Sequence, residues 1–157
     1  MKQIVIFDLD ETVVDSAHRT PNNSDGTLNL PLYLKLKTRE NTLRDGLLPI
    51  ADIWRSLNPA ETFIVVCTAR TWADFDQEFL DIHGLRANMI IARFTEAQKT
   101  LRDSELKSRG LRKLFNLRQF RHLPKYMFDD AKPVIAAMRR LGIVCLNSHK
   151  INARLKA

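Results

Sequence analysis

The stretch IVIFDLDET, residues 4–12, carries most of the information about the fold. Four apolar residues, three of them β-branched, lead directly into Asp8 and Asp10. A continuous apolar run without alternation is typical of a strand that is covered on both faces. In parallel α/β sheets, sites form beyond the carboxyl ends of the strands. The stretch therefore predicts a buried strand that delivers two carboxylates to the mouth of a site.

Working outward from this strand, apolar and amphipathic segments alternate along the chain. Strands are predicted at residues 3–7, 62–67, 89–92, 126–128 and 144–146. Helices are predicted at residues 49–57, 72–83, 105–115 and 132–141. Such alternation indicates an α/β fold, a three-layer sandwich around a mainly parallel sheet.

One segment does not follow the alternation. Residues 21–26 have the composition of a turn, and leucines then recur at every second position from Leu28 to Leu36. The segment is predicted to be either a β-flap or a helix that begins after Pro31. We interpret residues 20–46 as a small flap or cap insertion over the active site, within a single domain of residues 1–157.

The charge of the chain is concentrated in one region. Residues 86–125 contain eleven Lys or Arg against three acids, whereas the whole chain carries a net charge of +7. A localised basic block suits a polyanionic partner such as nucleic acid. A solvated helix surface is the alternative interpretation.

Other features of the composition narrow the class of protein. With 157 residues, 45% hydrophobic and 27% charged, the chain is expected to form one globular domain. It has no apolar run of about 20 residues and no signal-peptide pattern, so a cytoplasmic location without a membrane partner is expected. Cys67 and Cys145 end apolar runs and are predicted to be buried free thiols, and the four histidines lack metal-ligand spacing.

Polar residues follow three of the predicted strands. Asp8 and Asp10 follow the first, Thr68 and Arg70 the second, and the pair Asp129-Asp130 the fourth. Four carboxylates at one place would repel one another, and a divalent cation relieves this conflict. Oxygen-only ligands suit Mg²⁺, which would also neutralise a bound phosphate. A threonine hydroxyl and a lysine, Thr68 and Lys107, could then stabilise a phosphoryl group.

This order of residues resembles the four-motif pattern of the haloacid dehalogenase (HAD) superfamily. The resemblance implies that Asp8 attacks phosphorus and forms an aspartyl-phosphate. It implies that Asp10 protonates the leaving oxygen and then activates water. Mg²⁺ would be held by Asp8, the backbone carbonyl of Asp10 and one member of the Asp129-Asp130 pair. Thr68 and Lys107 would hold the phosphoryl group.

The lysine of the third motif has competitors. Lys99, Lys113 and Lys125 also lie between the flanking motifs. Lys107 opens a predicted helix that leads into the strand before Asp129, which resembles the family's arrangement. Lys99 is the second choice, and a solvated lysine on a basic helix is the alternative interpretation of Lys107.

A narrower resemblance is to the 3′-phosphatase domain of bacteriophage polynucleotide kinase/phosphatases. It rests on Arg19, on Arg70 in the stretch CTAR, on Asp103 four residues before Lys107, and on the stretch RRLGIVC at residues 139–145. It implies that Arg19 and Arg70 contact phosphate and that Asp103 orients Lys107. Each of these three residues could instead be a surface ion-pair residue.

The sequence also departs from those phosphatases. Glu11 stands where they usually have glycine, and the opening DLDET also resembles acid phosphatases and C-terminal-domain phosphatases. No G-x-x-x-x-G-K-[ST] loop is present, so the kinase half is absent. The insertion after Pro21 differs as well, and such insertions usually determine substrate choice.

These observations lead to one predicted function and two alternatives. The predicted function is a Mg²⁺-dependent phosphomonoesterase that removes 3′-phosphates from nucleic-acid ends, because the basic block suits a polynucleotide. The first alternative is a nucleotidase or a general small-molecule HAD phosphatase. The second is a non-catalytic module that binds a nucleic-acid end or a protein partner. The order of residues argues against a receiver domain. In a receiver the lysine comes after all of the acidic residues, whereas here it precedes the Asp129-Asp130 pair.

Overall fold

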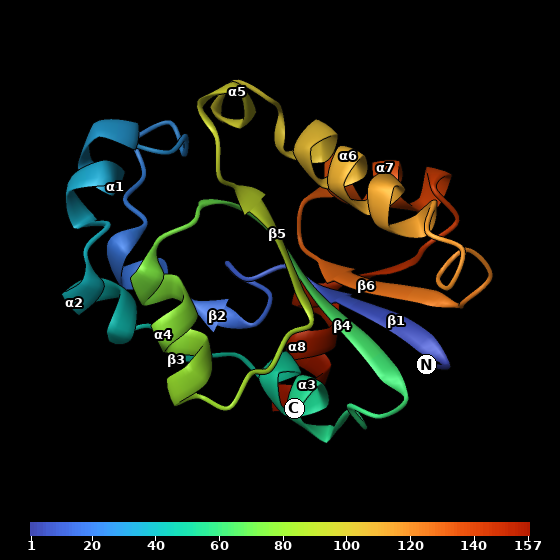
Figure 1. Cartoon of the computed structure of the whole chain (residues 1–157). Helices are drawn as coiled ribbons and strands as arrows, with labels where there is room; N and C mark the ends of the chain where they lie inside the picture. The colour runs from blue at the N-terminus through green and yellow to red at the C-terminus, as the bar shows by residue number, and fades with distance from the viewer.

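The computed structural model describes all 157 residues and contains one five-stranded parallel sheet with the strand order β5-β4-β1-β6-β7 (Figure 1). Its strands are β1 (Gln3–Phe7), β4 (Thr62–Thr71), β5 (Met89–Arg93), β6 (Lys125–Asp129) and β7 (Val144–Asn147). The predicted parallel α/β sheet is therefore confirmed. β1 lies in the centre, which agrees with its continuous apolar run.

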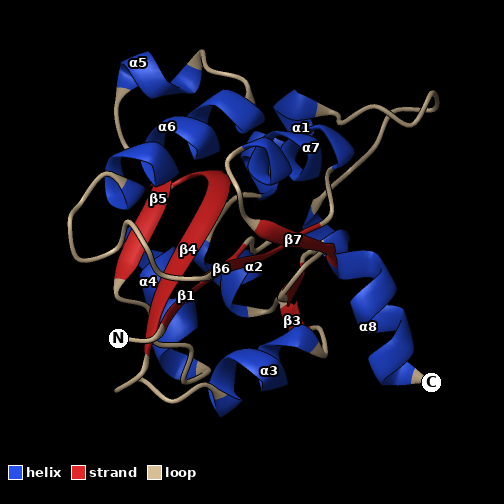
Figure 2. Ribbon diagram, turned by 90° about the vertical axis from the view of Figure 1, so that its right-hand side faces the viewer, coloured by secondary structure: helices blue, strands red, loops and turns tan.

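Helices cover both faces of this sheet, as Figure 2 shows. One face is covered by α6 (Asp103–Phe115) and α7 (Lys132–Arg140), and the other by α3 (Ile50–Ser56), α4 (Asp74–Ile82) and α8 (Ser148–Lys156). The result is the predicted three-layer sandwich.

β1 contributes to both of the cores that this arrangement creates. Ile4 and Ile6 are fully buried on the side of α6 and α7. Val5 and Phe7 are buried on the opposite side, where the ring of Phe7 stacks on Trp54 of α3 at 4.7 Å between centroids. Burial of apolar surface on both faces makes β1 the rigid support for the residues that follow it.

Helix α6 approaches the sheet closely because it contains a glycine. A Cβ atom on Gly110 would lie 2.6 Å from Cγ2 of Ile91 in β5. A glycine usually weakens a helix interior by about 1 kcal/mol. Here it allows the helix backbone to rest directly on the edge strand.

The insertion is helical. It contains α1 (Leu30–Leu36) and α2 (Arg39–Leu43), and it lies beside α4 (Figure 1). Of the two possibilities, the β-flap is wrong, and the helix is closer to the structure although it begins at Leu30, before Pro31. Asn29 caps the helix by accepting a hydrogen bond from Leu32 N at 3.2 Å, and Pro31 fits the first turn. The alternating leucines suggested a strand with one buried face. No residue of α1 is buried, so the segment has no such face.

The insertion is joined to the sheet by short elements. A 3₁₀ turn, η1 (Ala17–Arg19), precedes it, and β2 (Val14–Asp15) pairs antiparallel with β3 (Gly46–Leu47). The two ends of the insertion are therefore held together next to the carboxyl end of β1.

Two predicted boundaries need correction at β4 and α4. β4 continues to Thr71, with an irregular register between Cys67 and Thr71, so Thr68 lies within the strand and not after it. α4 begins at Asp74, and Asp76 accepts a hydrogen bond from Ala73 N at 2.9 Å. α4 therefore begins two residues later than the predicted residue 72, because β4 extends to Thr71.

Several smaller features complete the fold. The short helix α5 (Glu96–Lys99) and the helix α8 had no counterpart among the predicted elements. Cys67 and Cys145 are both buried and free, as predicted. No helix has the length and apolar character needed to cross a bilayer.

The close contact at Gly110 gives a stability test. Replacing Gly110 by Ala should lower the free energy of unfolding by about 1–3 kcal/mol, because the added methyl group overpacks against Ile91. Chemical denaturation measures this change. In an Ile91→Ala background the same substitution should cost much less, and an equal cost in both backgrounds would show that the contact is not the cause.

Candidate active site

The loop after β1 presents its carboxylates from a fixed backbone. Asp8 N donates to Phe128 O at 3.0 Å, and Val13 N and Val14 N both donate to Leu9 O at 2.9 Å. Glu11 has a φ of 59°, a left-handed conformation that favours glycine. A glycine would adopt this conformation without steric cost, so Glu11 is a strained residue of the loop.

Helix α8 holds the same loop from outside. The side chain of Asn152 accepts a hydrogen bond from Ile50 N at 3.0 Å and donates one to Thr12 O at 2.9 Å. Thr12 Oγ1 lies 2.9 Å from Ser148 Oγ and 3.3 Å from Asp8 Oδ2. Asp8 is therefore fixed through its backbone by β6 and through its side chain by Thr12, which the last helix holds in place.

Three carboxylates gather at the carboxyl ends of β1 and β6. Oxygen atoms of Asp8, Asp129 and Asp130 all lie within 4.8 Å of one another. All the donors are hard oxygen atoms, the ligand type that Mg²⁺ prefers. The residues present therefore fit a magnesium site, as the sequence predicted, whereas the side chain of Asp10 points to other partners.

Lys107 lies among these carboxylates. Its side chain is buried, and Nζ is 3.1 Å from Asp8 Oδ1 and 2.7 Å from Asp129 Oδ2. Burial alone would lower the pKa of Lys107, but Asp8 and Asp129 raise it above the ordinary value. The competing candidate Lys99 pairs with Glu96 on the surface. Of these two lysines, Lys107 is the one that the fold brings to the site.

The buried carboxyl group of Asp8 lies near three other carboxylates, which affect its pKa. Burial raises the pKa of Asp8 well above its usual range, and Asp129, Asp10 and Asp130 raise it further, while Lys107 opposes them. A cation bound beside Asp8 would reverse this balance.

Asp10 is held by an arginine. Arg70 Nε and Nη2 donate to the two oxygens of Asp10 at 2.9 and 2.7 Å, and Ser16 Oγ donates to it at 2.9 Å. Burial would raise the pKa of Asp10, yet the charge and hydrogen bonds of Arg70 lower it below its ordinary value. Asp10 is therefore ionised in this arrangement.

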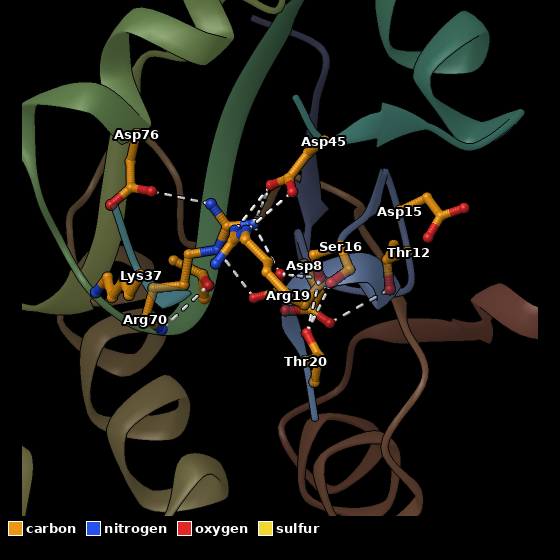
Figure 3. A network of polar contacts seen from close by, with 12 residues as sticks. Asp8, Thr12, Asp15, Ser16, Arg19, Thr20, Lys37, Asp45, Arg70 and Asp76 are labelled. Carbon is orange, nitrogen blue, oxygen red and sulfur yellow. Dashed lines mark hydrogen bonds and ion pairs between the residues drawn. The ribbon is translucent and has the colours of Figure 1, made fainter. Parts of the chain in front are cut away.

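A second arginine lies next to Arg70 (Figure 3). Arg19 is buried, and its Nε and Nη2 donate to Asp45 at 2.9 and 2.8 Å. Asp45 also lies 3.8 Å from Arg70, and Arg70 Nη1 donates to Asp76 at 2.9 Å. Two buried guanidinium groups are thus compensated by acids from the insertion and from α4.

Thr68 and the insertion complete the surroundings. Thr68 is buried and accepts a hydrogen bond from Arg70 N at 3.2 Å, so its hydroxyl hydrogen is free to donate. Lys37, which follows α1, donates from Nζ to Thr71 O, and Figure 3 places it beside Arg70. The insertion therefore borders the site, on the side of Asp10.

The whole chain, residues 1–157, matches the family described as bacteriophage T5 5′-deoxynucleotidase. This chain belongs to that family. The 5′-deoxynucleotidase of Escherichia phage T5 is 28% identical over 170 residues, which cover 97% of this chain and 69% of that protein.

Solved structures agree at the level of the fold. A chain of the Pnkp1/Rnl/Hen1 complex superposes with a TM-score of 0.66 at 20% identity over 94% of this chain. This chain spans 46% of that one. A haloacid dehalogenase-like hydrolase from Streptococcus pneumoniae gives a TM-score of 0.62 at 16% identity, over 92% of this chain and 83% of that one. These structures confirm the predicted HAD fold, and the family match over the whole chain supports the coarse function, a phosphatase or nucleotidase.

One predicted role is wrong in this member of the 5′-deoxynucleotidase family. Asp103 does not reach Lys107. Its carboxylate accepts a hydrogen bond from Arg93 Nη2 at 2.7 Å, and its side chain is 58% exposed. The reason is that Lys107, one turn further along α6, points inward to Asp8 and Asp129.

Three residues of the site were not predicted from the sequence. No local sequence pattern points to Asp45, because it contacts Arg19 only when the two ends of the insertion come together. Asp76 could have been found as the capping acid of α4 if the end of β4 had been placed correctly. Asn152 lies on the unpredicted helix α8.

The buried arginine cluster gives a second stability test. Asp45→Asn should lower the free energy of unfolding by about 3–5 kcal/mol, because it leaves buried guanidinium charge without a counter-ion. The control is Asp52→Asn, the same chemical change in an exposed pair with Arg55. Equal midpoints of denaturation for the two variants would contradict the assigned role of Asp45.

The raised pKa of Asp8 gives a third stability test. Because burial raises the pKa of Asp8 above its unfolded value of about 4, the metal-free fold loses stability as the pH rises through and beyond that value. Asp8→Asn should therefore raise the melting temperature in EDTA at neutral pH by a few degrees. This advantage should shrink toward pH 4, and a lower melting temperature than wild type at pH 7 would contradict it.

Proposed function

We propose that this protein is a Mg²⁺-dependent nucleotidase that removes the phosphate of deoxynucleoside 5′-monophosphates through an aspartyl-phosphate on Asp8. One observation carries the proposal. Asp8, Lys107 and the Asp129-Asp130 pair meet at one edge of the sheet in a chain whose full length matches a 5′-deoxynucleotidase family. The alternative of a nucleotidase thus has more support than the predicted polynucleotide 3′-phosphatase.

In the proposed first step, an oxygen of Asp8 attacks phosphorus and the bond from phosphorus to the nucleoside oxygen breaks. Asp10 supplies the proton that the departing oxygen needs. In the second step, Asp10 takes a proton from water, which attacks the phosphoryl group and releases inorganic phosphate and free Asp8. Thr68 and Lys107 donate hydrogen bonds to the phosphoryl oxygens, where negative charge develops.

Arg70 links substrate binding to the state of Asp10. In the structure both edges of its guanidinium are used, one by Asp10 and the other in part by Asp76. A substrate phosphate competes with Asp10 for the same N–H groups, because arginine binds phosphate and carboxylate with similar geometry. Withdrawal of Arg70 raises the pKa of Asp10, which prepares it to carry a proton.

The metal site is proposed to use Asp8, Asp130 and the backbone carbonyl of Asp10. Asp129 has both oxygens engaged, Oδ2 by Lys107 at 2.7 Å and Oδ1 by Ala131 N at 2.9 Å. Asp130 is partly exposed, and His149 at 3.6 Å is its closest basic partner. Asp130 is therefore the better direct ligand, while Asp129 fixes Lys107. Bound Mg²⁺ supplies positive charge that offsets the phosphate and the carboxylates.

Removal of 3′-phosphates from nucleic-acid ends stays a prediction. The chain in the Pnkp1/Rnl/Hen1 complex is similar in fold, but at 20% identity the likeness does not extend to a substrate.

The decisive measurement is phosphate release from deoxynucleoside 5′-monophosphates, 3′-monophosphates and a 3′-phosphorylated oligonucleotide, each with Mg²⁺ or with EDTA. The 5′-monophosphates should be hydrolysed fastest, and both EDTA and Asp8→Asn should abolish release. Asp52→Asn serves as the matched control and should retain full activity. Faster release from the oligonucleotide would restore the 3′-end hypothesis, and activity that survives Asp8→Asn would exclude the proposed mechanism.

A further inference from the structure

The outer surface of α6 carries basic side chains that the catalytic site does not use. Arg109 and Arg112 lie one turn apart on α6, and Arg140 ends α7. All three are exposed and form no ion pair with an acid. Arg93, on β5, is not available in the same way, because its guanidinium already donates hydrogen bonds to Ala69 O and to Asp103.

The three free arginines share one groove. It lies between α6 and α7, has a volume of about 350 Å³, and includes Ser104 and Ser108. Glu105 is its single acidic residue. Three guanidinium groups and two hydroxyl groups make the groove suitable for phosphate oxygens.

An apolar hollow adjoins this groove on the other side of α6. It has a volume of about 550 Å³, lies against the edge strand β5, and is also lined by Arg109 and Arg112. Its lining includes Ile90, Leu101 and the ring of Phe94, which is 58% exposed, and no acidic residue. An aromatic ring therefore lies within the same surface as the free cations.

We propose that this surface, defined by Phe94, Arg109, Arg112 and Arg140 and called the α6 surface, binds single-stranded nucleic acid. The arginines bind phosphodiester groups, and a base stacks on Phe94 over the apolar hollow. A basic groove next to an exposed aromatic ring is a combination that proteins use to bind single strands. A duplex would leave the hollow unfilled, because its bases are stacked inside the helix.

The α6 surface is separate from the catalytic site. Lys107 points from the same helix inward to Asp8, whereas Arg109 and Arg112 point to solvent. The proposed binding therefore goes beyond hydrolysis of mononucleotides, and substitutions on the α6 surface leave the catalytic groups in place.

Fluorescence anisotropy with a labelled single strand of about 15 nucleotides tests the proposal. Binding by the full chain should weaken between about 50 and 200 mM salt, because counter-ions are released from the strand. Three phosphate contacts predict a slope of about −2 in a plot of log K against log salt concentration.

Two variants separate the roles of charge and stacking. Arg109→Glu/Arg112→Glu should weaken binding at least tenfold and flatten the salt slope to about −0.7, since one contact remains. Phe94→Ala should weaken binding by about fivefold or more without changing the slope. Arg154→Glu/Lys156→Glu is the matched control, with the same charge change on exposed positions of α8. It should bind within about twofold of wild type.

Any one of four results would overturn the proposal. The first two are no binding by the wild type at low salt, and equal losses of binding in the two charge-reversal variants. The others are a duplex bound as tightly as the single strand, and a Phe94→Ala variant that loses self-association but keeps nucleic-acid binding. The last result would assign the hollow to contacts between copies of this chain. The melting temperature should be unchanged in every variant, which reports an intact fold and keeps this test independent of the proposed nucleotidase activity.

Discussion

The buried contact of one ammonium group with two carboxylates determines the rest of the site. Lys107 lies 3.1 Å from Asp8 and 2.7 Å from Asp129, and without it two adjacent strands would end in uncompensated charge. The contact requires α6 to lie close to the sheet, which Gly110 permits. It also leaves Asp130 as the more accessible carboxylate, so the fold itself separates a structural acid from a candidate metal ligand.

Much of the sheet and of the site could be predicted because both depend on local patterns. Continuous apolar runs mark buried strands, and β1 was predicted with its observed bounds, Gln3–Phe7. Once the strands are parallel, Asp8 and Asp129 must share an edge. The coarse function followed from the same residues, and similarity over the whole chain confirmed it.

What could not be predicted depends on contacts between distant segments or on burial. The leucines of α1 alternate like a strand, but local capping by Asn29 makes the segment helical and none of its residues is buried. Asp45 compensates Arg19 only because β2 and β3 close the insertion. Asp103 was assigned to Lys107 from the resemblance to the phage phosphatases, and its actual partner, Arg93, depends on where β5 ends.

The order of the strands in the sheet has a consequence for synthesis on the ribosome. β1 is made before β4 and β6, the two strands between which it lies, so its apolar residues stay uncovered while the nascent chain grows. Asn152, which ties the loop after Asp8 to α3, emerges later than every motif residue. A ribosome-bound chain that already contains Asp8 through Asp130 would therefore have its chemistry encoded but not yet assembled.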